Sequence, residues 1–434
     1  MKVCVLGLWH LGTVTAACLA ELGHQVVGLD FDANRVAALS AGRMPVAEPG
    51  LRELLERGMS GGNLRLATGL DDALTGIEVL WVAHDTPIDD DDKADTNFVL
   101  AQIKHVLPSL PADTLVLISS QLPVGSIRHL EQSGAATDPG RPRRMAYCPE
   151  NLRLGSAVKD FLHPDRLVVG VRTDRDREPL LRLLSPITRR IEWMSVESAE
   201  MTKHAINAFL ATSVAFANEI ASLCESVGAD AKQVERGLKT DGRIGPRAYL
   251  APGGAFSGGT LARDLGFLDQ TARDHGIAAP LLSSVLPSNE AHKGWPQRQL
   301  QRLFPDLSQV TVAVWGLSYK PGTDTLRRSW PVEFCDWLLS TGATVRVHDP
   351  QVLDLPERWR GRVARSPDPV LAARGANALV IATAWPAYQT VAARQLVDGS
   401  ASLVVLDANR SLPGLAGAGP GLRYFAVGMS GARP

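Results

Sequence analysis

The sequence has 434 residues, enough for about two or three domains that each bury a core. Its 45 Lys and Arg nearly balance its 46 Asp and Glu, which argues against nucleic acid or an anionic membrane as a partner. The five cysteines are scattered, mostly in apolar segments, as is typical of reduced thiols in a cytoplasmic protein. We therefore expect a cytoplasmic protein without a signal peptide or membrane-spanning segment.

The N-terminal residues follow the pattern of a dinucleotide-binding unit. An apolar run at 2–7 predicts a buried parallel strand, and a helix and a second strand ending in Asp30 follow. An acid at this strand tip binds the adenosine ribose and repels a 2′-phosphate, so the pattern predicts NAD rather than NADP. The glycine fingerprint is incomplete, because Trp9 stands between Gly7 and Gly12. We expect the indole to crowd the pyrophosphate and weaken NAD binding.

The rest of this domain continues as alternating strands and helices. Strand candidates lie at 78–87, 114–126 and 143–151, with a helix at 97–110. Glu150 follows a proline at a strand end, where active-site groups of open α/β sheets collect.

Two other features of this domain have simpler explanations than chemistry. The acidic run Asp89–Asp92 is best explained as a solvated loop, with a metal site as the alternative, and we predict no bound metal. Cys148 is best explained as a buried structural thiol, with a nucleophile as the alternative.

The central stretch, residues 197–264, combines a long apolar helix with a glycine-rich loop. Lys203 and Asn207 lie four residues apart, so they share one helix face. Polar groups on a buried helix need partners, and the loop ends in Asp264, which suggests an active site. A lysine paired only for structure is the alternative. Because the helix is apolar on nearly all faces, we also predict a homodimer through residues 197–227.

A second α/β unit follows from about residue 310. Its strand, helix and strand end in Asp349, and its first crossover loop carries Lys320, Arg327 and Arg328, a reasonable anion site. The expected fold is α/β, with two Rossmann-like doubly wound domains joined by a long central helix. We place the domains at 1–195 (NAD binding), 196–300 (central helix and dimerisation) and 301–434 (nucleotide-sugar binding).

Six ordered stretches carry a resemblance to a known family: AEPGL, CPENLRLGSAVKDFLHPDRLVVG, KHAINAFLATSVAFANEIA, DGRIGP, GLSYKPGTDTLRRS and VHDP. With them the chain resembles the UDP-glucose/GDP-mannose dehydrogenase family along nearly its whole length. Members oxidise C6 of a nucleotide-sugar to a carboxylate by two hydride transfers to NAD. The resemblance implies an oxidoreductase of polysaccharide biosynthesis that acts on a UDP-sugar.

The resemblance also implies roles for individual residues. Lys203 and Asn207 would stabilise oxyanions, Asp264 would orient water or the lysine, and Glu150 would take part in proton transfer. The implied NAD contacts are Gly7, Trp9, His10, Leu11, Gly12, Asp30, Arg35, Thr86, Pro87, Gln121 and Arg327. The implied substrate contacts are Leu152, Arg153, Lys203, Asn207, Arg243, Tyr249, Gly253, Phe256, Ser257, Gly258 and Lys320, with Arg243 reaching the partner subunit's site.

The chain departs from the family pattern where the chemistry is most sensitive. Thr260 falls on the family's catalytic cysteine, and a hydroxyl is a far weaker nucleophile than a thiol. Asp85 replaces a glycine before TP, and Gln121 replaces a threonine before PVG. Two hypotheses follow: an oxidoreductase with altered chemistry that stops at or passes through free aldehyde, or a non-catalytic nucleotide-sugar-binding or regulatory homologue.

Overall fold

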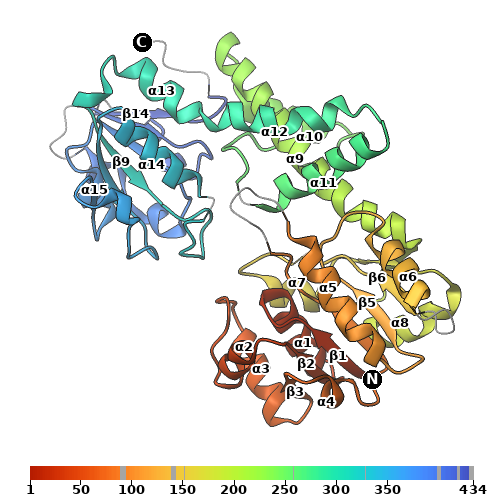
Figure 1. Ribbon diagram of the computed structural model, residues 1–434. Helices are drawn as coiled ribbons and strands as arrows, with labels where there is room; N and C mark the ends of the chain where they lie inside the picture. The colour runs from red at the N-terminus through yellow and green to blue at the C-terminus, as the bar shows by residue number, and fades with distance from the viewer. Residues whose placement is uncertain are drawn as a thin grey trace. The chain divides into compact units, whose positions relative to one another are not determined.

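The computed structural model describes residues 1–87, 94–137, 143–150, 152–257, 259–327, 329–397, 402–417 and 421–429. Contacts divide the chain into two units, Met1–Ala205 (unit 1) and Ile206–Pro434 (unit 2) (Figure 1). The division falls inside one long helix, α9 (Val196–Val227), which therefore belongs to both units. The three domain boundaries expected from the sequence stay a prediction.

Unit 1 is built on a single eight-stranded sheet. The strand order is β3-β2-β1-β4-β5-β6-β7-β8, and every described pair is parallel except β6 with β7. The strands are β1 (Lys2–Leu6), β2 (Gln25–Leu29), β3 (Leu64–Ala67), β4 (Val79–Val82), β5 (Leu115–Ile118), β6 (Arg144–Tyr147), β7 (Leu167–Gly170) and β8 (Ile191–Met194). The order reverses between β1 and β4, the position at which such sheets bind dinucleotides.

Helices cover both faces of this sheet (Figure 1). They are α1 (His10–Glu21), α2 (Ala33–Ser40), α3 (Leu51–Ser60), α4 (Leu70–Leu74), α5 (Thr96–Val106), α6 (Ser126–Thr137), α7 (Ala157–Leu162) and α8 (Arg177–Leu184). Alternate residues of β1 enter different cores: Val3 and Val5 pack on one side, and Cys4 and Leu6 on the other. A parallel sheet covered on both faces explains why its strands are continuous apolar runs.

Unit 2 combines a helical part with a second parallel sheet. The helical part contains the rest of α9 with α10 (Ala231–Thr240), α11 (Gly259–Asp274), α12 (Pro280–Lys293) and α13 (Trp295–Leu303). The sheet order is β11-β10-β9-β12-β13-β14. Its elements are β9 (Thr311–Trp315), α14 (Trp330–Ser340), β10 (Thr344–His348), β11 (Val363–Arg365), α15 (Pro369–Ala373), β12 (Ala378–Ile381), α16 (Ala393–Leu396), β13 (Leu403–Leu406) and β14 (Leu422–Phe425).

The predicted fold class is confirmed, because two doubly wound parallel sheets and a long central helix are present. One helix was not predicted from the sequence. The polar stretch from Trp295 begins with helix α13, whose Trp295 and Leu300 are buried in the core of unit 2.

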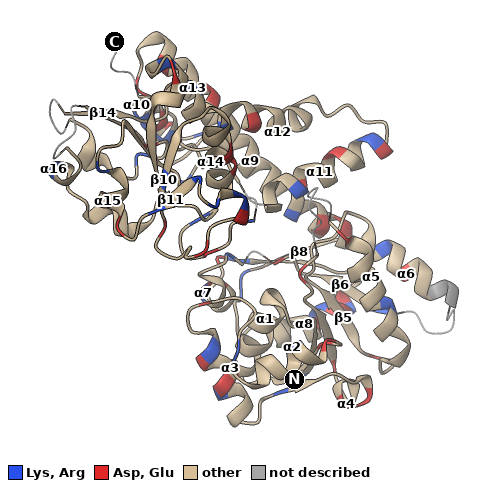
Figure 2. Cartoon of the chain, turned by 60° about the vertical axis from the view of Figure 1, so that its left-hand side comes forward, with Lys and Arg blue, Asp and Glu red and all other residues tan. Residues whose placement is uncertain are grey.

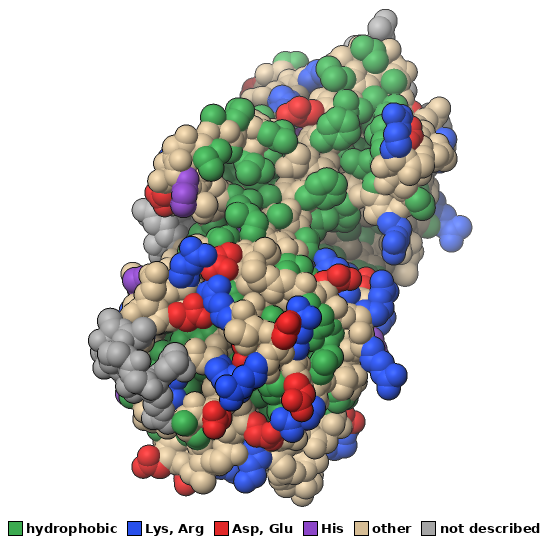
Figure 3. All heavy atoms as spheres, turned by 90° about the vertical axis from the view of Figure 1, so that its right-hand side faces the viewer, with side chains coloured by type: hydrophobic (Ala, Val, Ile, Leu, Met, Phe, Trp, Pro, Cys, Tyr) green, Lys and Arg blue, Asp and Glu red, His purple; other side chains and the backbone are tan. Residues whose placement is uncertain are grey.

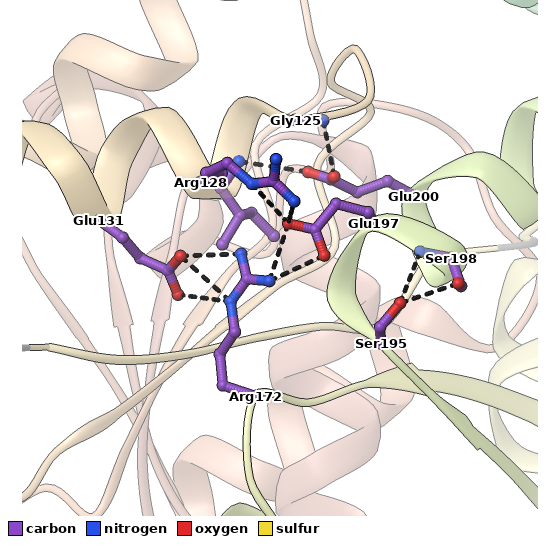
Figure 4. A network of polar contacts seen from close by, with 9 residues as sticks. Gly125, Arg128, Glu131, Arg172, Ser195, Glu197, Ser198 and Glu200 are labelled. Atoms are coloured by element: carbon purple, nitrogen blue, oxygen red, sulfur yellow. Dashed lines mark hydrogen bonds and ion pairs between the residues drawn. The ribbon is translucent and has the colours of Figure 1, made fainter.

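The first turns of α9 are fixed in unit 1 by buried hydrogen bonds (Figure 4). Ser195 precedes the helix, and its Oγ accepts the Ser198 amide at 3.3 Å, which is the bond of an N-cap. Glu200 is fully buried and accepts the Gly125 and Ile127 amides at 2.8 and 3.2 Å. Because these amides lie at the start of α6, the carboxylate joins the beginnings of the two helices.

Ion pairs reinforce the same joint (Figure 4). The Arg172 guanidinium donates to Glu131 on α6 and to Glu197 on α9, both at 2.8 Å. Arg128 donates to Glu197 at 3.0 Å. The network ends one turn before Lys203, so it fixes the part of α9 that presents this lysine.

The middle of α9 is apolar and carries no Asp, Glu, Lys or Arg between Lys203 and Glu219 (Figure 2). By length and composition α9 could cross a membrane, a test that core helices of soluble proteins also pass; 44% of its most apolar window is buried. Phe209, Phe216 and Leu223 on this helix are 69%, 46% and 61% exposed. In Figure 3 hydrophobic side chains gather over the helical part of unit 2.

Candidate active site

The turn between β1 and α1 has the close packing of a dinucleotide-binding turn. Gly7 has a φ of +92°, and a Cβ added there would lie 2.5 Å from His84 Nδ1. A Cβ on Gly12 would lie 1.6 Å from the Gly7 carbonyl oxygen. Both positions therefore require glycine, the first for its left-handed backbone and the second for the approach of α1 to the turn.

Asp30, Arg35 and Trp9 lie together beside this turn. Asp30 accepts the Leu8 amide at 2.7 Å and Arg35 Nη1 at 2.8 Å. The Arg35 guanidinium stacks over the Trp9 ring, 5.3 Å from its centroid, and the indole is 44% exposed. The acid at the tip of β2 is where the adenosine ribose binds in this fold, so these residues fit the ribose end of NAD.

Asp85 contacts the other end of the turn. It follows β4, and its Oδ2 accepts the Leu11 amide, in the first turn of α1, at 3.0 Å. Burial raises the Asp85 pKa to about 6; the Leu11 bond and His10 act against the increase, and the Glu150 charge adds to it. The sequence marked Asp85 as a departure from the family but did not place it in the site.

Glu48 is a site residue that the sequence analysis missed. Its buried carboxylate accepts the Gly155 and Ala157 amides at 2.8 and 2.7 Å, and its Oε2 lies 3.2 Å from His10 Nε2. It therefore joins α1 to the segment that follows Glu150. The only signal was its place in the AEPGL stretch.

The buried Lys203 and the half-buried Glu150 form a pair in unit 1. Lys203 is 5% exposed, and its Nζ donates to the Glu150 carbonyl at 2.5 Å and lies 3.5 Å from Glu150 Oε1. The other carboxylate oxygen of Glu150 accepts the Leu152 amide at 2.8 Å. The structure thus brings together the proposed oxyanion stabiliser and the proposed proton-transfer group.

Asn207 and Asp264 form a second buried pair, in unit 2. Asn207 Nδ2 donates to Asp264 Oδ2, and Asp264 on α11 is fully buried. Thr260 is the second residue of α11, four before Asp264, and it is exposed. Lys203 and Asn207 are one turn apart on α9, so a single helix carries one member of each pair.

The loop at 249–257 is held by side chains from two helices of unit 2, α9 and α12. Asn218 on α9 and His292 on α12 bond the Gly253 amide and carbonyl at 2.9 and 2.8 Å. Asn289 brackets Phe256, accepting its amide at 2.9 Å and donating to its carbonyl at 3.0 Å. Sequence analysis assigned no role to the last two anchors, because they lie more than thirty residues from the loop.

The two ends of this loop, Tyr249 and Ser257, have exposed side chains. Tyr249 is 61% exposed. Asn409, which follows β13, accepts the Gly254 amide at 2.8 Å, so the second sheet also supports the loop. A fixed backbone with exposed side chains is the arrangement expected of a ligand-binding loop.

The remaining predicted site residues are placed as follows. Thr86 Oγ1 donates to the Gln121 carbonyl at 2.7 Å, and Pro87 is exposed. Arg153 pairs with Asp160, Arg243 pairs with Asp241, Lys320 Nζ lies 5.6 Å from the Tyr319 ring centroid, and Arg327 is exposed. Gly258, Arg328 and the acidic run Asp89–Asp92 lie outside the described residues.

Cys148 is fully enclosed in the protein, and burial raises its pKa to about 12. A thiol in this state is not an activated nucleophile. This environment supports the structural role of Cys148 that the sequence analysis preferred. All five cysteines are unpaired and buried.

A nicotinamide-dinucleotide-dependent dehydrogenase needs a turn for the dinucleotide and, near it, groups that stabilise a developing alkoxide. The β1–α1 turn and the Lys203 pair meet these two needs. Family models match residues 1–188 (NAD binding domain), 197–291 (central domain) and 313–413 (UDP binding domain). The chain belongs to the UDP-glucose/GDP-mannose dehydrogenase family, and it is an NAD-dependent oxidoreductase.

Relatives match nearly the whole chain. UDP-glucose 6-dehydrogenase of Pseudomonas aeruginosa is 36% identical over 403 residues, covering 90% of this chain and 89% of its own. The Rhizobium meliloti UDP-glucose 6-dehydrogenase is 32% identical over 435 residues, covering 99% of both chains. The solved UDP-glucose dehydrogenase from Pyrobaculum islandicum has a TM-score of 0.85 at 31% identity, covering 99% of this chain and 98% of its own.

Proposed function

We propose that this protein uses NAD to oxidise the C6 hydroxyl of a UDP-glucose-like nucleotide-sugar, with an end point altered by Thr260. The pair of the buried Lys203 with Glu150 carries the proposal, because an ammonium buried beside a carboxylate can stabilise an alkoxide while the carboxylate accepts a proton. Relatives named UDP-glucose 6-dehydrogenase and the UDP binding domain at 313–413 support this substrate class.

Each buried group has a role in the proposed alcohol oxidation. Lys203 and Asn207 stabilise negative charge on the substrate oxygen, and Asp264 orients Asn207. Glu150 accepts the hydroxyl proton, and its side chain, 22% exposed, can pass the proton on to water. NAD, when bound, supplies the acceptor for the hydride that leaves C6.

The contacts of the substrate stay a prediction from the family resemblance. We assign its contacts to Leu152 and Arg153 after β6, to the loop residues Tyr249, Gly253, Phe256, Ser257 and Gly258, and to Lys320. Support for the loop comes from its anchoring by Asn218 and His292, which fixes the backbone in place. We assign Arg243, which is fully exposed, to the partner subunit's site.

The reaction is proposed to stop at the aldehyde or to pass through it as a free species. A thiol forms a covalent adduct with the aldehyde, and this adduct makes the second oxidation efficient; the Thr260 hydroxyl lacks that nucleophilicity. Thr260 lies exposed near the start of α11. The aldehyde is therefore expected to be accessible to a carbonyl reagent.

The experiment is a stoichiometric turnover with NAD and UDP-glucose in the presence and absence of an aldehyde-trapping reagent. We expect about one NADH per sugar with trapped aldehyde, and a loss of about a hundredfold to a thousandfold in rate for Lys203→Ala. Lys159→Ala, an exposed lysine on α7, is the matched control and should keep the rate. Two NADH per sugar without trappable aldehyde would contradict the altered end point.

A second candidate function is nucleotide-sugar binding without catalysis. The observation that favours it is the Asp85 carboxylate on an amide of the dinucleotide turn. Tight binding of UDP-glucose with no NADH under any of these conditions would establish it in place of the oxidoreductase.

We also propose a cytoplasmic homodimer that supplies polysaccharide biosynthesis. Phe209, Phe216 and Leu223 are exposed and seven residues apart, so they form one stripe along α9. A helix with such a stripe is suited to pair with its copy by two-fold symmetry. Balanced charge and buried, unpaired cysteines support the cytoplasmic location.

A further inference from the structure

We propose that Asp85 is a gate on the dinucleotide site: its carboxylate occupies the α1 amide that a dinucleotide phosphate would use, and NAD binds tightly only when this carboxylate is neutral or displaced. The inference concerns cofactor binding alone. Its test needs no sugar substrate, so it stands or falls separately from the reaction proposed above.

The geometry of the helix start carries the proposal. Leu11 is the second residue of α1, and the first bond within the helix starts only at Thr13, whose amide donates to the Trp9 carbonyl at 3.0 Å. Amides of a first helical turn have no partner within the helix, and together they bind anions such as phosphate. Asp85 Oδ2 accepts the Leu11 amide at 3.0 Å, so an anion supplied by the chain already uses this donor.

Both neighbours of Asp85 are fixed, which holds the carboxylate at the turn. His84 is 6% exposed and its ring lies where a Cβ on Gly7 would be. Thr86 is 7% exposed, and its hydroxyl donates to the Gln121 carbonyl at 2.7 Å. The backbone between them cannot swing away freely, so displacement needs a rotation of the Asp85 side chain or the loss of its charge.

Charge decides the competition between Asp85 and a diphosphate. The charged or titratable groups that act on Asp85 are His10 from α1 and Glu150 from the end of β6. An ionised Asp85 and an ionised Glu150 both carry negative charge, so they repel the negatively charged diphosphate. A neutral Asp85 can donate a hydrogen bond to a phosphate oxygen instead of repelling it.

The direction of the pH dependence follows from the Asp85 pKa. Burial and Glu150 hold this pKa at about 6, so the carboxyl is ionised at higher pH and neutral at lower pH. Because bound diphosphate favours the neutral form, binding takes up a proton near neutral pH. NAD affinity is therefore expected to fall as the pH rises through this value.

The test is a calorimetric titration of NAD into wild type and Asp85→Asn between about pH 5 and pH 8. At the upper pH we expect the variant to bind NAD about tenfold to a hundredfold more tightly, which corresponds to about one to two pKa units. Wild type should approach the variant at the lower pH, and its proton uptake should disappear in the variant. Asp72→Asn, the same change at an exposed residue of α4, should match wild type throughout.

Three results would overturn the proposal. Equal NAD affinity for wild type and Asp85→Asn at every pH would show that the carboxylate does not compete. An undiminished pH dependence of NAD binding in Asp85→Asn would show that a group other than Asp85 causes it. Failure of both proteins to bind NAD would show that removing the charge does not open the site. If Asp85→Asn does not fold, the proton uptake on NAD binding is compared between wild type and His10→Gln. Loss of this proton uptake in His10→Gln would overturn the proposal that Asp85 is a gate.

Discussion

At the scale of single residues, the proposed end point of the reaction depends on Thr260. We propose that its hydroxyl stands where the family pattern has a catalytic thiol; it lies four residues before the buried Asp264 on the same helix. The exposed position offers space for a thiol, and the start of a helix lowers the pKa of a thiol placed there. The pair of Lys203 with Glu150 is formed within unit 1, and the pair of Asn207 with Asp264 is formed within unit 2.

We therefore predict that Thr260→Cys changes the end point of the reaction. The thiol should capture the aldehyde, and the yield should rise from about one to about two NADH per sugar, with less trappable aldehyde. NADH stoichiometry together with mass spectrometry of the sugar product measures the change. Thr271→Cys, the same substitution on α11, should leave the stoichiometry unaltered. An unchanged yield in Thr260→Cys would show that another feature sets the end point.

At the scale of an element, the start of α9 depends on a cluster of carboxylates and guanidinium groups in unit 1 (Figure 4). Burial alone would raise the Glu197 pKa, but hydrogen bonds from Arg172 and Arg128 outweigh burial, and the pKa lies below its ordinary value. A carboxylate with a lowered pKa stabilises the folded state most when it is ionised. Its contribution is complete above the pKa of an unfolded glutamate and is lost as the pH falls through the folded pKa.

We predict that Glu197→Gln lowers the free energy of unfolding by about 1.5 to 3 kcal/mol at neutral pH, because two charge-assisted hydrogen bonds are lost. The difference from wild type should shrink as the pH falls below the ordinary glutamate pKa of about 4.3 and through the lower folded pKa of Glu197. Chemical denaturation across this range measures both effects. Glu192→Gln on β8, an exposed glutamate nearby in the chain, should be close to neutral. A constant difference at all pH values would contradict the ionic mechanism.

Local sequence patterns predicted the helices and strands well. They did not predict contacts between residues that lie far apart in the sequence. The β1, α1 and β2 unit with Asp30 follows from residues that are neighbours in sequence, so periodicity sufficed. Glu48 binds amides 107 and 109 residues away, and Asp85 binds an amide 74 residues away. No spacing rule connects such positions, since the pairing is set by which strands and loops meet at the sheet edge.

At the scale of the whole molecule, the two sheets repeat one construction. Asp30 accepts the amide of Leu8, after Gly7, and Asp349 accepts the amide of Leu317, after Gly316, each at 2.7 Å. The side chains that bond the two acids differ. Trp385 Nε1 donates to Asp349 at 3.1 Å, whereas Arg35 donates to Asp30. The repeated backbone thus carries different side chains, consistent with different ligands in the two sheets.

We predict that the exposed stripe of α9 sets the oligomeric state. Phe216→Glu places a charge in the centre of the stripe and should convert the expected dimer into a monomer at micromolar concentration, because an unpaired charge is costly to bury. Light scattering measures the mass. Leu353→Glu, at a residue 68% exposed in the second sheet domain, is the matched control and should remain a dimer. A wild-type monomer, or a dimeric Phe216→Glu, would contradict the prediction.

The placement of sulfur in this protein has a consequence for its chemical resilience. All five thiols are buried, and burial raises the pKa of Cys4, Cys18 and Cys148 to about 12. Electrophiles and peroxides attack exposed thiolates, so the folded chain offers them little to attack. A dehydrogenase with a hydroxyl at Thr260 should remain active under oxidative stress that silences enzymes dependent on an exposed cysteine. Labelling by an alkylating agent would then report unfolding rather than loss of an active-site group.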